Sequence, residues 1–231
     1  MSRRVMGRLL ATVAAFAVVG AACSSKSETT ASRPSAAAKP SAAVSLSSGG
    51  PALVQTLTDQ LDGHVYLASI AVVEGLVNGL DSGEFMAAAE ALDQNSQDLA
   101  ASITSVYGEE GGEQFLDLWR KHIGFFVDYT AGKATKDQAK ADKALQALEN
   151  YKQDFSAFLD SATGGKLPSD AAAGALQMHV DSLIEAIDAA VAGDPSVFAK
   201  VYTAATEHMP ETASALAGAI SQQFPDKFPL S

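Results

Sequence analysis

Apolar residues from position 51 onward recur at three- and four-residue spacing, the period of an amphipathic helix. Leu53, Leu57 and Leu61 begin one such stripe, and Pro51 suits the first turn of a helix because its missing N–H needs no partner there. No window shows the sustained two-residue alternation that is typical of a half-buried strand. We therefore predict an all-α domain over residues 51–231.

Glycine, proline and capping residues divide this domain into shorter segments. Gly79, Gly132 and Gly193 each follow an apolar stripe and are typical of helix ends, and Thr135 is expected to cap the helix after Gly132. Asp194-Pro195 is a typical cap and first-turn pair, whereas Pro210 must kink or restart a helix. The predicted helices are 51–79, 81–108, 113–131, 135–164, 170–193 and 194 onward, kinked at Pro210.

Three histidines suggest an internal repeat within these helices. His64, His122 and His179 lie 58 and 57 residues apart, each in the first helix of a predicted pair. Residues 99–103 also resemble residues 216–220. Repeats of this length are typical of packed helical units. We therefore predict a six-helix bundle built from three antiparallel helical hairpins, with a repeat of about 57 residues.

The N-terminus has a composition unlike that of the helical domain. Arg3, Arg4 and Arg8 precede an uncharged apolar run over residues 9–22, which is too short to span a bilayer and is typical of a signal peptide. This run leads through small residues to Cys23, the only cysteine. Residues 23–50 are rich in Ser, Ala, Thr and Pro, so they are predicted to form a disordered tether.

The run Val19-Gly20-Ala21-Ala22-Cys23 resembles the lipobox of bacterial lipoprotein precursors. The resemblance implies that residues 1–22 are removed and that Cys23 carries acyl chains such as palmitate. It places the protein in the bacterial cell envelope, anchored on the outer side of the cytoplasmic membrane or in the outer membrane. The alternative is plain secretion with a free Cys23. Ser2-Arg3-Arg4 also resembles a twin-arginine signal, so the export route stays open between this and the general one.

Charge restricts the partners of the domain. Residues 51–231 contain 26 acidic residues against 10 basic ones, and no basic residue lies between Lys39 and Arg120. Phosphate binding requires clustered Lys and Arg, so nucleic acid is excluded as an expected partner. An acidic surface of this kind favours cations or basic surfaces, although it also serves solubility alone.

The histidines are the candidate ligands of a metal ion. His64, His122 and His179 lie on the apolar sides of their helices, and the interior of a bundle is where helical proteins build metal sites. His208 precedes the expected kink. Met178 directly precedes His179, and Met209 directly follows His208. Imidazole together with thioether sulfur suits copper, particularly Cu(I). We therefore predict a lipid-anchored, copper-type metal-binding protein with His64, His122, His179 and His208 as ligands and Met209 and Met178 as auxiliaries.

A second hypothesis assigns the same histidines to packing. The protein would then be an envelope scaffold that docks a protein, a glycan or a lipid through its acidic surface or aromatic residues. The sequence has no Glu-x-x-His or His-Glu-x-x-His motif, no Gly-x-Ser-x-Gly motif and no phosphate-binding loop. No catalytic residue can be named, and we expect a binding protein rather than an enzyme.

Overall fold

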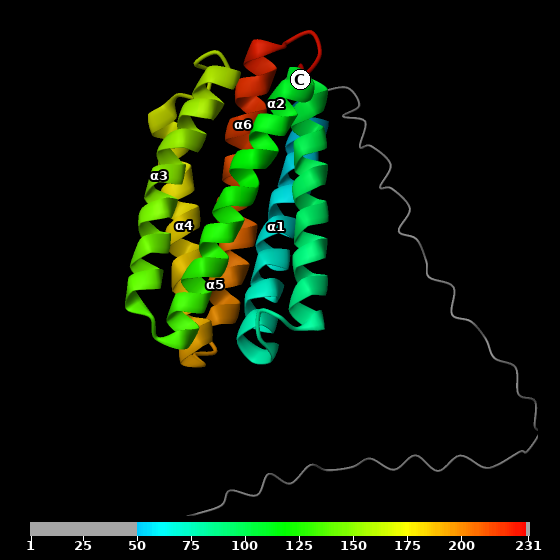
Figure 1. The fold of residues 1–231 in the computed structure, drawn as a ribbon. Coiled ribbons are helices and arrows are strands. Elements are labelled where there is room, and N and C mark those ends of the chain that lie inside the picture. The colour runs from blue at the N-terminus through cyan, green and yellow to red at the C-terminus, as the bar shows by residue number, and fades with distance from the viewer. Residues whose placement is uncertain (1–49, 230–231) are drawn as a thin grey trace, which may run out of the picture. The chain divides into compact units, whose positions relative to one another are not determined.

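The computed structural model of the protein describes residues 50–229, in which helices joined by short turns account for the regular structure and no strand occurs. The all-α prediction is therefore confirmed, and the helices pack as a bundle (Figure 1). The predictions for the signal peptide, for Cys23 and for the tether lie outside the described residues. The elements are α1 (Gly50–Asn78), α2 (Gly83–Thr135), α3 (Gln138–Ala162), α4 (Ser169–Ala192), α5 (Val197–Thr203), the π-helix η1 (Ala204–His208) and α6 (Met209–Gln223).

Helix α1 lies close to its predicted bounds of 51–79. It ends where Gly79 takes a left-handed backbone with φ of 94°, which glycine adopts without a steric cost. One face of α1 is buried along its length, and this helix packs against both α2 and α6. It therefore presents its buried face to helices from both ends of the domain.

Helix α2 folds back on itself at Gly108. The backbone there has φ of 80° and ψ of 176°, which is non-helical and belongs to a region that favours glycine. Arg120 Nε lies 2.7 Å from Asp93 Oδ1, although 27 residues of straight helix would separate them by about 40 Å. Figure 1 shows the two antiparallel runs of α2. The predicted break at residue 108 is correct, but the predicted gap before residue 113 is absent.

The turn between α2 and α3 corrects one prediction. Thr135 is the last residue of α2 and its hydroxyl donates to Ala131 O, so it is not the cap of the next helix. Asp137 takes that role by accepting a hydrogen bond from Lys140 N at 3.0 Å. A Cβ atom on Gly132 would lie 2.7 Å from the backbone nitrogen of Ala141. Glycine at this position therefore permits the close approach of α2 and α3.

The C-terminal segment contains the predicted irregularity at Pro210. Asp194 accepts a hydrogen bond from Ser196 N, and α5 begins at Val197. The π-helical turn η1 then ends at His208, directly before α6. Pro210 has no N–H and its ring clashes with the carbonyl four residues earlier, so a regular α-helix cannot continue through it.

Large aromatic residues fill the core between these helices. Phe115, Trp119, Phe126 and Tyr129 of α2 are all buried, as their apolar spacing predicts. Phe228, which follows α6, is also buried and fixes the end of the domain against the bundle. Within residues 50–229, no helix combines the length and apolar character that crossing a membrane requires.

Candidate metal centre

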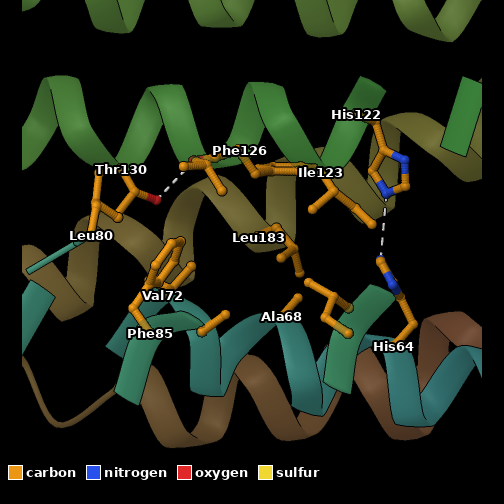
Figure 2. A pocket seen from close by; sticks show the side chains of 13 residues that line it. His64, Ala68, Val72, Leu80, Phe85, His122, Ile123, Phe126, Thr130 and Leu183 are labelled. Carbon is orange, nitrogen blue, oxygen red and sulfur yellow. Dashed lines mark hydrogen bonds between the residues drawn. The ribbon is translucent and has the colours of Figure 1, made fainter. Parts of the chain in front are cut away.

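Two of the predicted ligands, His64 and His122, border a small cavity between α1 and α2. The cavity has a volume of about 30 Å³, and the other side chains around it are almost entirely apolar (Figure 2). In that view the two histidines face each other at one end, and Phe85 and Leu80 lie at the other. The cavity therefore has a polar end formed by imidazole rings alone.

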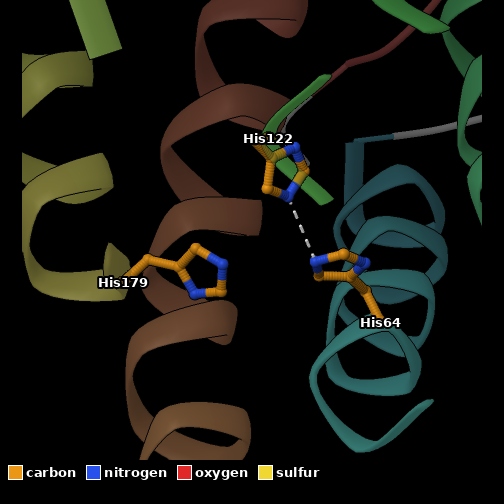
Figure 3. Close-up of side chains that lie close together, drawn as sticks. All are labelled: His64, His122 and His179. Carbon is orange, nitrogen blue, oxygen red and sulfur yellow. Dashed lines mark hydrogen bonds between the residues drawn. The ribbon is translucent and has the colours of Figure 1, made fainter. Parts of the chain in front are cut away.

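A third imidazole, that of His179 on α4, completes a cluster with these two rings (Figure 3). Each histidine offers one ring nitrogen such that the three nitrogens lie within 4.8 Å of one another. His64 and His122 are 2% exposed and His179 is 6% exposed. Three helices that are distant in sequence thus bring their imidazole rings together in the interior of the bundle.

The spacing of these nitrogens is close to that of metal ligands. His64 Nε2 and His122 Nε2 are 3.4 Å apart, and two nitrogens bound to one metal at 2.0–2.1 Å are separated by about 3.3–3.6 Å. The His179 ring centroid lies 5.9 Å from that of His64 and 6.5 Å from that of His122. A shift of about 1 Å in the His179 ring would bring all three nitrogens to coordination distance.

Most of the ring nitrogens in the cluster have no protein partner within residues 50–229. The one interaction is the His64–His122 contact, in which one Nε2 donates and the other accepts. The Nδ1 atoms of all three histidines and Nε2 of His179 are buried without a hydrogen bond in this part of the chain. Buried polar atoms are paired in the great majority of cases, so these nitrogens are unusual and are available to a ligand.

Aromatic side chains surround the cluster. The Trp119 ring centroid lies 4.7 Å from that of His64 and 4.5 Å from that of His122. Tyr151 of α3 stacks on His122 with centroids 5.0 Å apart, and the edge of Phe126 faces both His122 and His179. Trp119 lies three residues before His122, so the helical period already places them on one face. Sequence reasoning missed Tyr151, because no local pattern links α3 to this position.

This environment keeps the histidines neutral. Burial, with a smaller contribution from repulsion by His179, lowers the pKa of His64 to about 3. Burial lowers the pKa of His179 to about 4, with a smaller contribution from His208. The pKa of His122 is also well below its ordinary value, first because of burial and then because of the other two rings. At neutral pH the three rings therefore keep lone pairs that can bind a cation.

The other three predicted ligands lie outside this cluster. His208 and Met178 line a separate surface pocket beside α4 and η1, and the Met178 side chain is 46% exposed. Met178 precedes His179 directly, and adjacent helical residues do not face the same direction. Met209 is buried and lines a larger internal cavity that His122 and His179 also border. Within the described residues, the structure thus brings together three of the six predicted ligands.

Comparisons of this chain with protein-family models, with curated proteins and with solved structures give no match. The function is therefore inferred from the geometry and chemistry of the cluster.

Proposed function

We propose that this protein binds a metal ion, copper first, through His64, His122 and His179. The observation that carries the proposal is the convergence of three neutral, buried imidazoles whose nitrogens lie within 4.8 Å of one another. A bound cation would satisfy the unpartnered nitrogen atoms and would hold the three helices together. Histidines that serve only packing have no need to place their nitrogens at this spacing, because each could pair with a carbonyl group.

The chemistry of the ligand set favours copper. Imidazole binds Zn²⁺, Cu, Fe and Ni, and the affinity order of the divalent ions is highest at Cu²⁺. Within residues 50–229, the metal-type cluster consists of imidazoles alone and contains no carboxylate. A divalent ion would leave two uncompensated charges in an apolar interior, whereas Cu(I) leaves one, and the cost of burying charge rises steeply with charge. Cu(I) is therefore the proposed resident state.

His208 and Met178 are not part of the proposed site, because they line a separate surface pocket together with carboxylates of α4, among them Asp181. Met209 remains the candidate soft fourth ligand, because it is buried and lines the larger internal cavity that His122 and His179 also border.

The envelope location and the duplication of the hairpin remain part of the proposal. The resemblance of residues 19–23 to a lipobox supports an acylated Cys23 behind a tether of 27 residues, Ser24 to Gly50. The spacing of the three histidines supports descent of the three hairpins of a six-helix bundle from one unit of about 57 residues. A Cys23→Ser variant that is still cleaved after residue 22 and still reaches the membrane fraction would contradict the lipoprotein part, because a lipobox cysteine is acylated before that cleavage.

A second function has its own supporting observation. An apolar surface groove of about 510 Å³ lies between α1 and α5, and Ile70, Phe198 and Tyr202 in its lining are at least half exposed. Exposed apolar patches of this kind mark interaction sites in soluble proteins. The groove supports an envelope scaffold that docks a protein, a glycan or a lipid, with or without a metal in the interior.

The test of metal binding is a titration of the purified full chain, after treatment with a chelator, with Cu(I), Cu(II) and Zn(II). Cu(I) affinity is measured in competition with a coloured Cu(I) chelator under reducing conditions. We expect one tightly bound Cu(I) per chain and weaker Zn(II) binding. His122→Ala and His179→Ala should each lower the Cu(I) affinity by at least about a hundredfold, since each removes one of three ligands.

The matched control is His208→Ala, which removes a histidine outside the cluster and should change the Cu(I) affinity by less than about tenfold. Circular dichroism of each variant separates loss of a ligand from loss of the fold. Cu(I) binding that survives both His122→Ala and His179→Ala in folded protein would overturn the proposal. Equal loss in His208→Ala would instead place the metal toward the surface pocket.

A further inference from the structure

The larger internal cavity has a composition that differs from that of the metal cluster. It has a volume of about 120 Å³ and lies among α1, α2, α3, α4 and α6, with Phe155 and Met209 in its lining. Its lining includes no Asp, Glu, Lys or Arg from residues 50–229. An apolar cavity of about 150 Å³ binds benzene, and this cavity is slightly smaller, so its size is close to that of one small ring.

Four polar side chains in the lining have atoms that nothing in residues 50–229 satisfies. They are Trp119 Nε1, Tyr151 Oη, Nδ1 of His122 and both nitrogens of His179. Trp119 is 6% exposed, Tyr151 is 4% exposed and His179 is 6% exposed. The Tyr151 hydroxyl carries a proton and can donate a hydrogen bond, and its oxygen is buried without a partner in this range.

These polar atoms specify the chemistry of an occupant. Trp119 Nε1 can only donate a hydrogen bond, and the Tyr151 hydroxyl in the same lining is also without a partner in residues 50–229. An occupant therefore needs an acceptor atom. Apart from the two histidines, the rest of the lining is almost entirely apolar, which favours a hydrocarbon body.

We propose that this cavity binds a small, uncharged organic molecule about the size of one six-membered ring, apolar except for one oxygen acceptor. The oxygen accepts hydrogen bonds from Trp119 Nε1 and the Tyr151 hydroxyl, and the ring lies among Phe155, Leu176 and Met209. The proposal does not depend on a metal, because these donors and this volume belong to the protein alone. Its test is therefore carried out on metal-free protein.

The experiment uses phenol and benzene as matched probes, which share a ring and differ by one oxygen. Trp119 is the only tryptophan of the chain, so its fluorescence reports directly on the cavity. The metal-free full chain is titrated with each probe, with excitation at wavelengths where only tryptophan absorbs. We expect saturable changes in Trp119 emission with both probes and at least about tenfold tighter binding of phenol. If neither probe gives a saturable change, the cavity holds water only and the proposal is overturned.

Two kinds of variant test separately how the polar atoms and the volume of the cavity contribute to binding. Tyr151→Phe should weaken phenol binding at least about threefold and leave benzene binding unchanged, because only the hydroxyl is lost. Ala172→Leu places a larger side chain into the lining and should abolish binding of both probes, whereas Ala173→Leu, one position along α4 and outside the lining, should not. If Ala172→Leu does not fold, Leu216→Phe fills the cavity from α6 in its place. Phenol binding that is unaffected by Tyr151→Phe would overturn the assignment of the acceptor.

Discussion

Two layers of the bundle, one helical turn apart on α1, differ in how their polar groups are paired: Gln60 and Asn95 are half-buried, whereas the three histidines are buried. At Gln60, the amide donates to Asp98 O at 3.2 Å and accepts from Ser102 Oγ at 3.0 Å, and Asn95 Nδ2 donates to Gln60 O. Of these three side chains, only Asn95 Oδ1 has no partner in residues 50–229. At His64, by contrast, a single contact between two imidazoles is the only hydrogen bond of three buried rings in that range.

The contrast separates a half-buried polar network, which is paired within the protein, from buried imidazoles that are almost unpaired among the described residues. Helix α1 contributes to both layers, so the identity of the helix does not explain the difference, whereas the degree of burial differs between them. Buried polar groups that only stabilise a fold are paired within it in the great majority of cases. On the proposed function, the histidine layer costs stability in the metal-free protein and becomes favourable when an ion binds it.

Acidification should produce the largest effect, and it should act through the histidine layer. The pKa values of His64 and His179 are about 3 and about 4 in the folded protein, against about 6.5 when unfolded. The unfolded chain therefore binds more protons below pH 6.5, so stability is retained above this pH and is lost as the pH falls toward 4. One such histidine loses about 3 kcal/mol over two pH units, and the cluster contains three.

The measurement is the free energy of unfolding of metal-free protein by urea between pH 7 and 4.5. A His64→Leu, His179→Leu double variant should lose most of the pH dependence in this range. Gln60→Leu should keep the full dependence, because Gln60 does not titrate. Equal slopes in wild type and the double variant would show that carboxylates, rather than histidines, govern acid stability, and the contrast between the layers would lose its electrostatic basis.

Copper should stabilise the folded protein through the same layer. At a free Cu(I) concentration of a thousand times Kd, binding adds about 4 kcal/mol to the free energy of unfolding. We expect a corresponding rise in Tm for wild type and for Gln60→Leu, and a much smaller rise for His64→Leu, whose affinity is lowered by about a hundredfold or more. A Tm that rises equally in His64→Leu would indicate that copper binds elsewhere on this acidic protein.

Removal of one polar side chain from each layer should have unequal costs. Gln60→Leu leaves Ser102 Oγ and Asp98 O without the amide and should lower stability by about 1–3 kcal/mol. His179→Leu replaces a ring whose two nitrogens are unpartnered among the described residues with an apolar side chain of similar size. It should change the stability of metal-free protein by less than about 1 kcal/mol, or raise it. Urea unfolding of both variants at pH 7 tests this, and a larger loss in His179→Leu would contradict the comparison.

The sequence predicted the helices well and the site in part. Gly79, Gly193 and Pro210 act locally on the backbone, so their effects at 79, 193 and η1 could be foreseen. Helical periodicity also placed His64, His122 and His179 on inward faces, and the structure confirms that their rings meet. The cap at Asp137 was missed because Thr135 and Asp137 are both good capping residues, and only the close packing at Gly132 selects between them.

The rest of the site depends on how helices rotate against one another. Periodicity gives the buried face of a helix but not which of several inward residues reach a common point, so His208 and Met178 could not be separated from the cluster in advance. Tyr151 stacks on His122 only because α3 packs beside α2 at that level. The two cavities arise in the same way, from packing between helices that are distant in sequence.

The smallest expected effect is the difference in stability between two variants that each lose one hydroxyl group. Ser102→Ala removes the hydroxyl that donates to Gln60 Oε1 and should cost about 1 kcal/mol, since it leaves an acceptor with one partner fewer. Tyr151→Phe removes a buried hydroxyl with no partner among residues 50–229, so it should leave the stability of ligand-free protein unchanged or raise it by up to about 1 kcal/mol. Both changes in the free energy of unfolding are measured by urea unfolding. The slope m, by which this free energy falls with urea concentration, is fitted as one shared value, because neither substitution alters the surface exposed on unfolding. A loss in Tyr151→Phe as large as that in Ser102→Ala would mean that ordered water pairs the Tyr151 hydroxyl in the cavity, so its donor would not be free for an organic ligand.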